Sequence, residues 1–143
     1  MGRQLSNMKP LNLILSALLL ISASVGGYIL ATDSVLWSEA PTHAYGLVAF
    51  TVLDLALIVG LWKKPRIAII VALLLGLVQL GAMSGDVFFG TTTYTSNGYP
   101  AAAFTQYLLR DTAFVTLLWV QAVLIIVGIA AFVMWRRTPA ATK

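Results

Sequence analysis

Four long apolar stretches constrain the fold of this chain more than any other feature of its sequence. Three of them carry no charged residue and lie between Lys9 and Asp33, between Arg66 and Asp86, and between Asp111 and Arg136. In the fourth, between Glu39 and Lys63, the only charged residue is Asp54. A helix needs roughly 20 apolar residues to cross a bilayer core about 30 Å thick. Each stretch is long enough to be a membrane-spanning helix.

We therefore predict an all-α membrane protein with four transmembrane helices in an up-down bundle, forming one integral-membrane domain. The expected spans are residues 10–31, 44–62, 66–85 and 112–135, with an outer loop over residues 86–111. The composition, 59% hydrophobic and 10% charged, excludes a disordered chain and argues against a water-soluble domain. The apolar runs are continuous rather than alternating, which argues against a membrane β-barrel.

The charges also predict an orientation. Eight of the nine basic residues lie before the first predicted helix, between the second and third, or at the end of the fourth. They are Arg3, Lys9, Lys63, Lys64, Arg66, Arg136, Arg137 and Lys143. The positive-inside rule then places both termini in the cytoplasm, most simply across the plasma or cytoplasmic membrane. One alternative stays open, because residues 1–24 also fit a cleaved secretory signal whose removal would leave three spans.

The outer loop is rich in aromatic residues, namely Phe88, Phe89, Tyr94, Tyr99, Phe104 and Tyr107. Such a loop is expected to lie on the bundle, on the lipid headgroups or against another protein. Residues 91–96 favour a strand, and Asn97-Gly98 favours a turn. Two structures are open after Pro100: the fourth helix begins near Ala101, or residues 101–109 form a short interfacial helix that bends near Arg110-Asp111.

Asp54 is the most informative polar residue, because it lies near the middle of the second predicted helix. An acidic side chain at that depth usually faces a bundle interior, a partner or a wet cavity. It is either a proton or cation site, or a packing residue that hydrogen-bonds to Thr51 or to an amide on a neighbouring helix. Gln79 and Gln121 fall at similar depths, so we expect an intramembrane polar network of Asp54, Gln79, Gln121 and Thr51.

Small residues mark faces where membrane helices approach one another closely. The expected packing positions are Gly26, Gly27, Gly46, Ala49, Ala56, Gly60, Gly76 and Gly128. On the second helix, the stripe formed by Gly46, Ala49, Ala56 and Gly60 points roughly 120° away from Asp54. That helix must therefore contact at least two neighbours, in this chain or in a larger complex, if both features are buried.

Candidate catalytic and cofactor-binding residues are scarce. The sequence has no cysteine and one histidine, so thiolate sites and paired imidazoles are excluded within one chain. His43, Glu39 and Asp33 are weak candidates for an outer metal site, because carboxylates and imidazole are metal ligands. No nucleotide-binding loop or nucleophile motif is present. We predict no cofactor, contacts with membrane lipids, and no nucleic-acid partner, since the basic residues are dispersed along helix ends.

The leading functional hypothesis is a non-catalytic accessory or assembly subunit of a larger membrane complex or of a homo-oligomer. Three features motivate this hypothesis: the chain has few catalytic side chains, small residues lie on several helix faces, and the outer loop is aromatic. The first alternative is a small oligomeric transporter or channel that uses Asp54 for ion or proton coupling. The second alternative is a membrane enzyme subunit with a metal at its outer face.

Overall fold

The computed structural model describes residues 2–89 and 101–137. Within those ranges the backbone is helical almost throughout. The helices are α1 Gly2–Thr32, α2 Ser34–Glu39, α3 Pro41–Lys63, α4 Pro65–Phe89, α6 Ala101–Arg110 and α7 Thr112–Arg137. The expected strand and turn at residues 91–98 lie outside the described residues.

Four of these helices are long and apolar enough to cross a membrane: Pro10–Thr32, Pro41–Lys63, Pro65–Phe89 and Thr112–Arg136. They confirm the predicted all-α architecture with four spans. Both ends of each observed span lie within four residues of the predicted ends. The chain is an integral membrane protein by this criterion, because a helix satisfies its own backbone hydrogen bonds in hydrocarbon.

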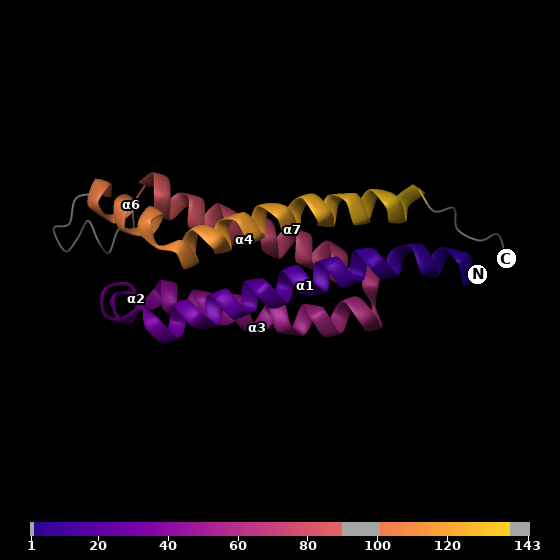
Figure 1. Ribbon diagram of the computed structural model, residues 1–143, viewed down its shortest axis with the longest axis horizontal. Helices are drawn as coiled ribbons and strands as arrows, with labels where there is room; N and C mark the ends of the chain where they lie inside the picture. The colour runs from indigo at the N-terminus through magenta and orange to yellow at the C-terminus, as the bar shows by residue number, and fades with distance from the viewer. Residues whose placement is uncertain (1, 90–100, 138–143) are drawn as a thin grey trace.

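The four long helices form an up-down bundle (Figure 1). Helix α1 contacts α3 and α7, and α4 contacts the same two helices, so the main contacts close a ring. The start of α1, the end of α7 and the turn between α3 and α4 share one end of the bundle (Figure 1). Short helices α2 and α6 lie at the opposite end, which we call the outer end.

Helix starts follow local sequence signals. Pro41 and Pro65 are the first residues of α3 and α4, where the missing N–H of proline costs no helical hydrogen bond. The Asp33 side chain accepts a hydrogen bond from the Leu36 N–H and caps α2. The Asp111 carboxylate accepts from the Ala113 N–H at 2.9 Å at the start of α7.

The cap at Asp111 decides between the two structures left open for the region after Pro100. Helix α6 ends at Arg110 and α7 begins at Thr112, so residues 101–110 form a separate short helix. The Thr105 hydroxyl of α6 donates to the Val87 carbonyl of α4 at 2.7 Å. Buried Leu108 packs with Ala40 in a small outer cluster. Helix α6 therefore lies on the bundle rather than projecting from it.

The main apolar core is built on one face of α1. Leu15 and Leu19 are fully buried, and they belong to a cluster with these residues of α3, α4 and α7: Leu57, Leu61, Ala68, Ile69, Ala72, Leu124 and Ala131. The buried positions of α1 recur at intervals of three and four, which places them on one helix face. The cluster includes Leu61 and Ala68, on either side of the α3–α4 turn, so it reaches the inner end of the bundle.

Only half of the predicted packing positions contact another helix of this chain. A β-carbon at Gly26, Gly60, Gly76 or Gly128 would meet a neighbouring helix at 3.4 Å or less. At Gly27 and Gly46 it would meet nothing within 4 Å. Ala49 and Ala56 are exposed. These last four positions make no close helix contact among the described residues, so close packing there stays a prediction for a partner outside this chain. Ala49 and Ala56 lie on the side of α3 that is turned away from Asp54.

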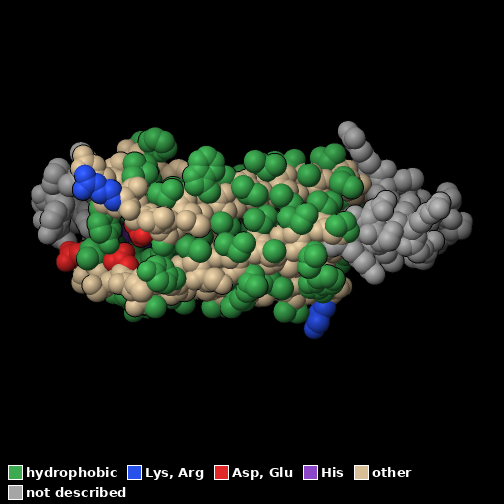
Figure 2. All heavy atoms as spheres, viewed as in Figure 1, with side chains coloured by type: hydrophobic (Ala, Val, Ile, Leu, Met, Phe, Trp, Pro, Cys, Tyr) green, Lys and Arg blue, Asp and Glu red, His purple; other side chains and the backbone are tan. Residues whose placement is uncertain are grey.

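The surface of the bundle is apolar between its two ends. Figure 2 shows hydrophobic side chains along the length of the visible face, with acidic side chains gathered at the outer end. Trp119 is 69% exposed although it lies well inside α7, so it does not belong to an aromatic belt at the membrane interface. Phe88 and Phe89 are also exposed, at the end of α4.

The closest approach between α4 and α7 provides a test of the fold. A β-carbon on Gly76 would lie 3.0 Å from Leu124 Cδ2 and 3.3 Å from Ile125 Cγ1. We expect Gly76→Leu to lower the free energy of unfolding by about 1–3 kcal/mol through overpacking. Gly81→Leu is the control, because a β-carbon there meets nothing within 4 Å. Unfolding in mixed micelles measures both, and equal losses would contradict the described α4–α7 contact.

Candidate functional site

A hydrogen-bonded chain of side chains crosses the middle of the bundle. The Ser22 hydroxyl of α1 donates to Asp54 Oδ2 of α3 at 2.5 Å. The Gln121 amide of α7 donates to the same Ser22 oxygen at 2.7 Å. The Gln79 side chain of α4 lies against the Asp54 carboxyl as a further hydrogen-bonding neighbour. Each of the four long helices thus contributes one residue to this group, which we call the polar network.

The polar network is closed off from the surroundings. Its four residues are each 5% exposed or less. Several acceptor oxygens nevertheless lack a hydrogen-bond partner among the described residues, namely Asp54 Oδ1, Gln79 Oε1 and Gln121 Oε1. A buried acceptor without a partner costs free energy, because hydrocarbon and protein cannot replace the hydrogen bonds of water. The unpaired oxygens of the polar network can therefore accept hydrogen bonds from further donors.

The sequence analysis predicted three of the four members of the polar network, and it also included Thr51, which does not belong to it. The Thr51 hydroxyl donates to the Leu47 carbonyl of its own helix at 2.8 Å and is not part of the polar network. It instead fills the space beside Gly26, where a β-carbon would lie 2.8 Å from Thr51 Oγ1. Ser22, which the sequence analysis did not select, is the central member. Its position on the same helix face as Leu15, Leu19 and Gly26 was the available signal.

A second buried polar contact lies nearer the inner end of the bundle. The Asn12 amide of α1 donates to the Leu61 carbonyl of α3 at 3.2 Å. Ser16, one turn further along α1, is also buried. Such contacts between helices contribute modestly, on the order of 0.6–2 kcal/mol each. Helix α1 therefore supplies buried polar side chains at two depths, and α3 accepts one hydrogen bond at each depth.

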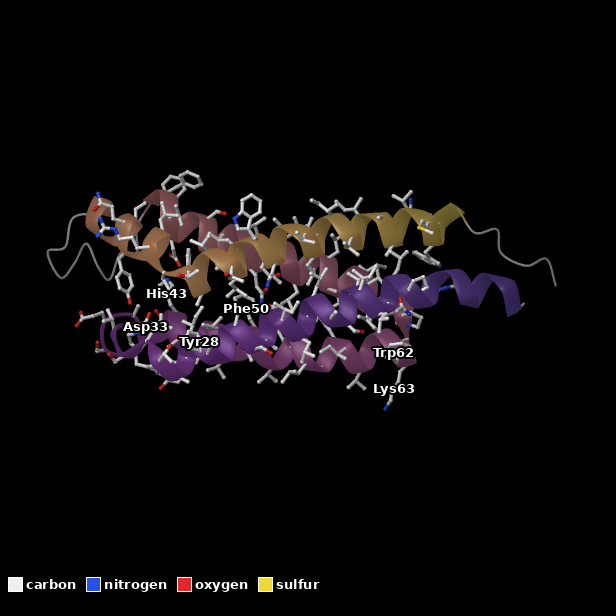
Figure 3. All side chains as sticks on the ribbon, in the orientation of Figure 1. Tyr28, Asp33, His43, Phe50, Trp62 and Lys63 are labelled. Atoms are coloured by element: carbon white, nitrogen blue, oxygen red, sulfur yellow. The ribbon has the colours of Figure 1, made fainter. Side chains whose placement is uncertain are left out.

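A cavity of about 360 Å³ lies at the outer end of the bundle. Side chains of α3, α4 and α7 form its apolar walls, including Leu47, Phe50, Met83, Phe114 and Leu117. Figure 3 shows His43 near the outer end of the bundle and Phe50 closer to its middle. Gln79 also lines the cavity, so its deepest part reaches one residue of the polar network.

The mouth of the cavity is acidic. His43 Nε2 lies 3.3 Å from Asp86 Oδ1, a contact that becomes an ion pair when the imidazole is protonated. Asp33 and Asp111 line the same space, and Tyr107 donates its hydroxyl to Asp33 Oδ2 at 3.1 Å. Figure 3 shows His43 and Asp33 together at the outer end.

The weak metal candidates of the sequence analysis are only partly brought together. Asp33 and His43 line the cavity, but His43 pairs with Asp86, and Glu39 is not among the lining residues. In the described part of the chain, no group of three or more His, Asp or Glu side chains is arranged to hold a metal ion. The carboxylates at the mouth remain hydrogen-bond acceptors with negative charge.

No protein-family model, curated protein or solved structure matches this chain. The geometry of the site can do two things: the polar network can hold four helices in register, and the cavity can accept a ligand from the outer end.

Ser22 provides a test of the polar network. Ser22→Ala leaves both Asp54 Oδ2 and the Gln121 amide without their bonds to the hydroxyl. We expect it to lower the free energy of unfolding by about 1–3 kcal/mol, the usual cost of unsatisfied buried groups. Ser24→Ala is the matched control, since the exposed Ser24 hydroxyl bonds only to the Leu20 carbonyl of its own helix. Chemical unfolding in mixed micelles compares them, and an equal effect would show that the network does not stabilise the bundle.

Proposed function

We propose that this protein is a non-catalytic accessory or assembly subunit of a larger membrane complex, or of a homo-oligomer. The observation that carries the proposal is the outward strip on α3 formed by Ala49, Leu53 and Ala56, all exposed. Two of these three residues are small, and small residues let transmembrane helices approach closely. Larger exposed side chains, Val52 and Val59, border the strip. The strip therefore suits a helix of another subunit.

The engagement of Asp54 supports the non-catalytic part of the proposal. An acidic residue in a transmembrane helix is commonly functional. Here its carboxyl accepts a hydrogen bond from Ser22 and contacts Gln79, so it already links three helices of its own chain. A residue used in this way holds the fold together. The alternative of a transporter that couples ions or protons through Asp54 would require that link to break in every cycle.

The orientation is part of the same proposal. Lys63, Lys64 and Arg66 lie at the α3–α4 turn, and Asp33, Glu39, Asp86 and Asp111 lie near helix ends at the outer end of the bundle. The positive-inside rule then supports a cytoplasmic location for the α3–α4 turn and both termini, in the plasma or cytoplasmic membrane. The outer cavity would face away from the cytoplasm.

Assembly through the α3 strip can be tested by enlarging it. We expect Ala49→Leu combined with Ala56→Leu to release single chains from the complex, because overpacking a close helix contact costs about 1–3 kcal/mol per site. Native mass measurement after gentle extraction into nanodiscs reports the assembly. Ala17→Leu combined with Ala130→Leu adds the same volume at exposed positions of α1 and α7 and should leave it intact. A wild-type protein extracted from its own membrane as a single chain would overturn the proposal.

The orientation can be tested with single cysteines, because the sequence contains none. We expect Ser38→Cys, at the outer end, to react with a membrane-impermeant maleimide in intact cells. Lys64→Cys should react only after the membrane is opened, since the α3–α4 turn would face the cytoplasm. Both native residues are exposed, so access to the reagent rather than burial decides the outcome. The reverse pattern of labelling would invert the proposed orientation.

A further inference from the structure

The outer cavity has hydrogen-bond acceptors at both ends and apolar walls between them. Gln79 lies at its deep end, and the carboxylates of Asp33, Asp86 and Asp111 lie around its mouth. Leu47, Met83 and Phe114 are among the side chains that line the space between. A volume of about 360 Å³ is within the usual range of small-molecule pockets, which are lined mainly by apolar side chains with a few placed polar groups.

The deep end needs a hydrogen-bond donor. Gln79 is 95% buried, and its Oε1 has no partner among the described residues. The side chain lies against the Asp54 carboxyl, so Gln79 is held in place by the polar network. A ligand group that donates a hydrogen bond would satisfy this oxygen, whereas an apolar group would leave it unpaired.

The mouth favours positive charge. Among the described residues, its charged or titratable lining side chains are Asp33, His43, Asp86, Tyr107 and Asp111, and no described Lys or Arg lines the cavity. Each carboxylate has one or two contacts with other described residues, but an ionised carboxylate can accept about four hydrogen bonds. A cation at the mouth would find free acceptor positions there, and an anion would meet like charges.

The two ends are separated by a fixed length of helix. Asp86 and Gln79 are seven residues apart on α4, which corresponds to about 10 Å at 1.5 Å per residue. A hydrogen bond at each end takes about 3 Å of that distance, which leaves about 5 Å between the two donor nitrogens. An unbranched chain of about four methylene groups spans it. A ligand with a donor at each end of such a chain would match the acceptors at both ends and the apolar walls.

We propose that this cavity binds a linear α,ω-diamine from the outer side of the membrane. One terminal amine donates to Gln79 Oε1, the methylene chain contacts the apolar walls, and the second amine, as an ammonium, lies among the carboxylates of the mouth. A bilayer lipid chain would fill the walls but would satisfy neither end. The inference concerns this one chain and does not depend on its assembly with other subunits.

The proposal is tested first with ligands. The full chain is placed in nanodiscs of phosphatidylcholine, and saturable binding is measured by calorimetry for diaminobutane, butylamine, butanediol and butanedioate. We expect diaminobutane to bind about tenfold more tightly than butylamine, a difference of about 1.4 kcal/mol for the second donor. Butanediol should bind more weakly than the diamine, and butanedioate should not bind. Absence of saturable diamine binding, or equal binding of butanedioate, would overturn the proposal.

Variants then assign the two ends. Gln79→Leu should reduce diaminobutane affinity to that of butylamine and should not weaken butylamine. Asp86→Asn combined with Asp111→Asn should weaken both amines about tenfold, while asparagine still caps α7. Glu39→Gln removes an acid outside the cavity and should change nothing. If Gln79→Leu weakens both amines equally, the assignment of the deep end is wrong.

A filled cavity provides a test that does not require changes to the polar network. Ala82→Phe places a ring in the cavity, since Ala82 lines it, and should abolish binding of the diamine. Leu77→Phe, on the side of α4 turned away from the cavity, places a ring outside it and should bind as the wild type does. Helical content and thermal unfolding check that each variant is folded. Unchanged binding by folded Ala82→Phe protein would place the amine elsewhere and overturn the proposal.

Discussion

The polar side chains inside this bundle must find their partners within the protein, because hydrocarbon offers no hydrogen bonds. The Ser22 hydroxyl meets that constraint for two helices at once: it donates to Asp54 and accepts from Gln121. With Gln79 against the same carboxyl, all four long helices meet at one depth. Apolar contacts between helices are scarcely different from contacts with lipid chains, so these polar contacts contribute to the rotation and register of each helix.

The polar network divides the bundle into two unlike halves. Toward the α3–α4 turn, Leu61, Ala68 and Ile69 pack closely with α1 and α7, and Gly60 lies against Ala68. Toward the outer end, the helices enclose the cavity, with α6 lying across α4 and α7. Gln79 belongs to both the network and the cavity. A ligand at its amide would therefore contact the residue that links α4 to Asp54.

Burial of Asp54 also determines what the outside of the bundle presents. Rotating α3 so that Asp54, Leu57 and Leu61 face inward turns Ala49 and Ala56 toward the surroundings. These residues can contact lipid or a helix of another protein, and their small size favours a helix. The proposed subunit role and the proposed ligand site thus use different sides of α3, whose rotation buries Asp54 together with Leu57 and Leu61.

The sequence by itself determined the four spans, because the lengths of its charge-free stretches match a bilayer, and it identified Asp54, Gln79 and Gln121 as buried polar residues. It did not determine which partners they would choose: Thr51 bonds to its own helix, and Ser22 takes its place. Nor did it decide between a continuous last helix and the break at Asp111, or show that His43 would meet Asp86 beside a cavity. Hydropathy is a property of each segment, whereas rotation and contact depend on how all four helices pack together, and only the tertiary structure contains that information.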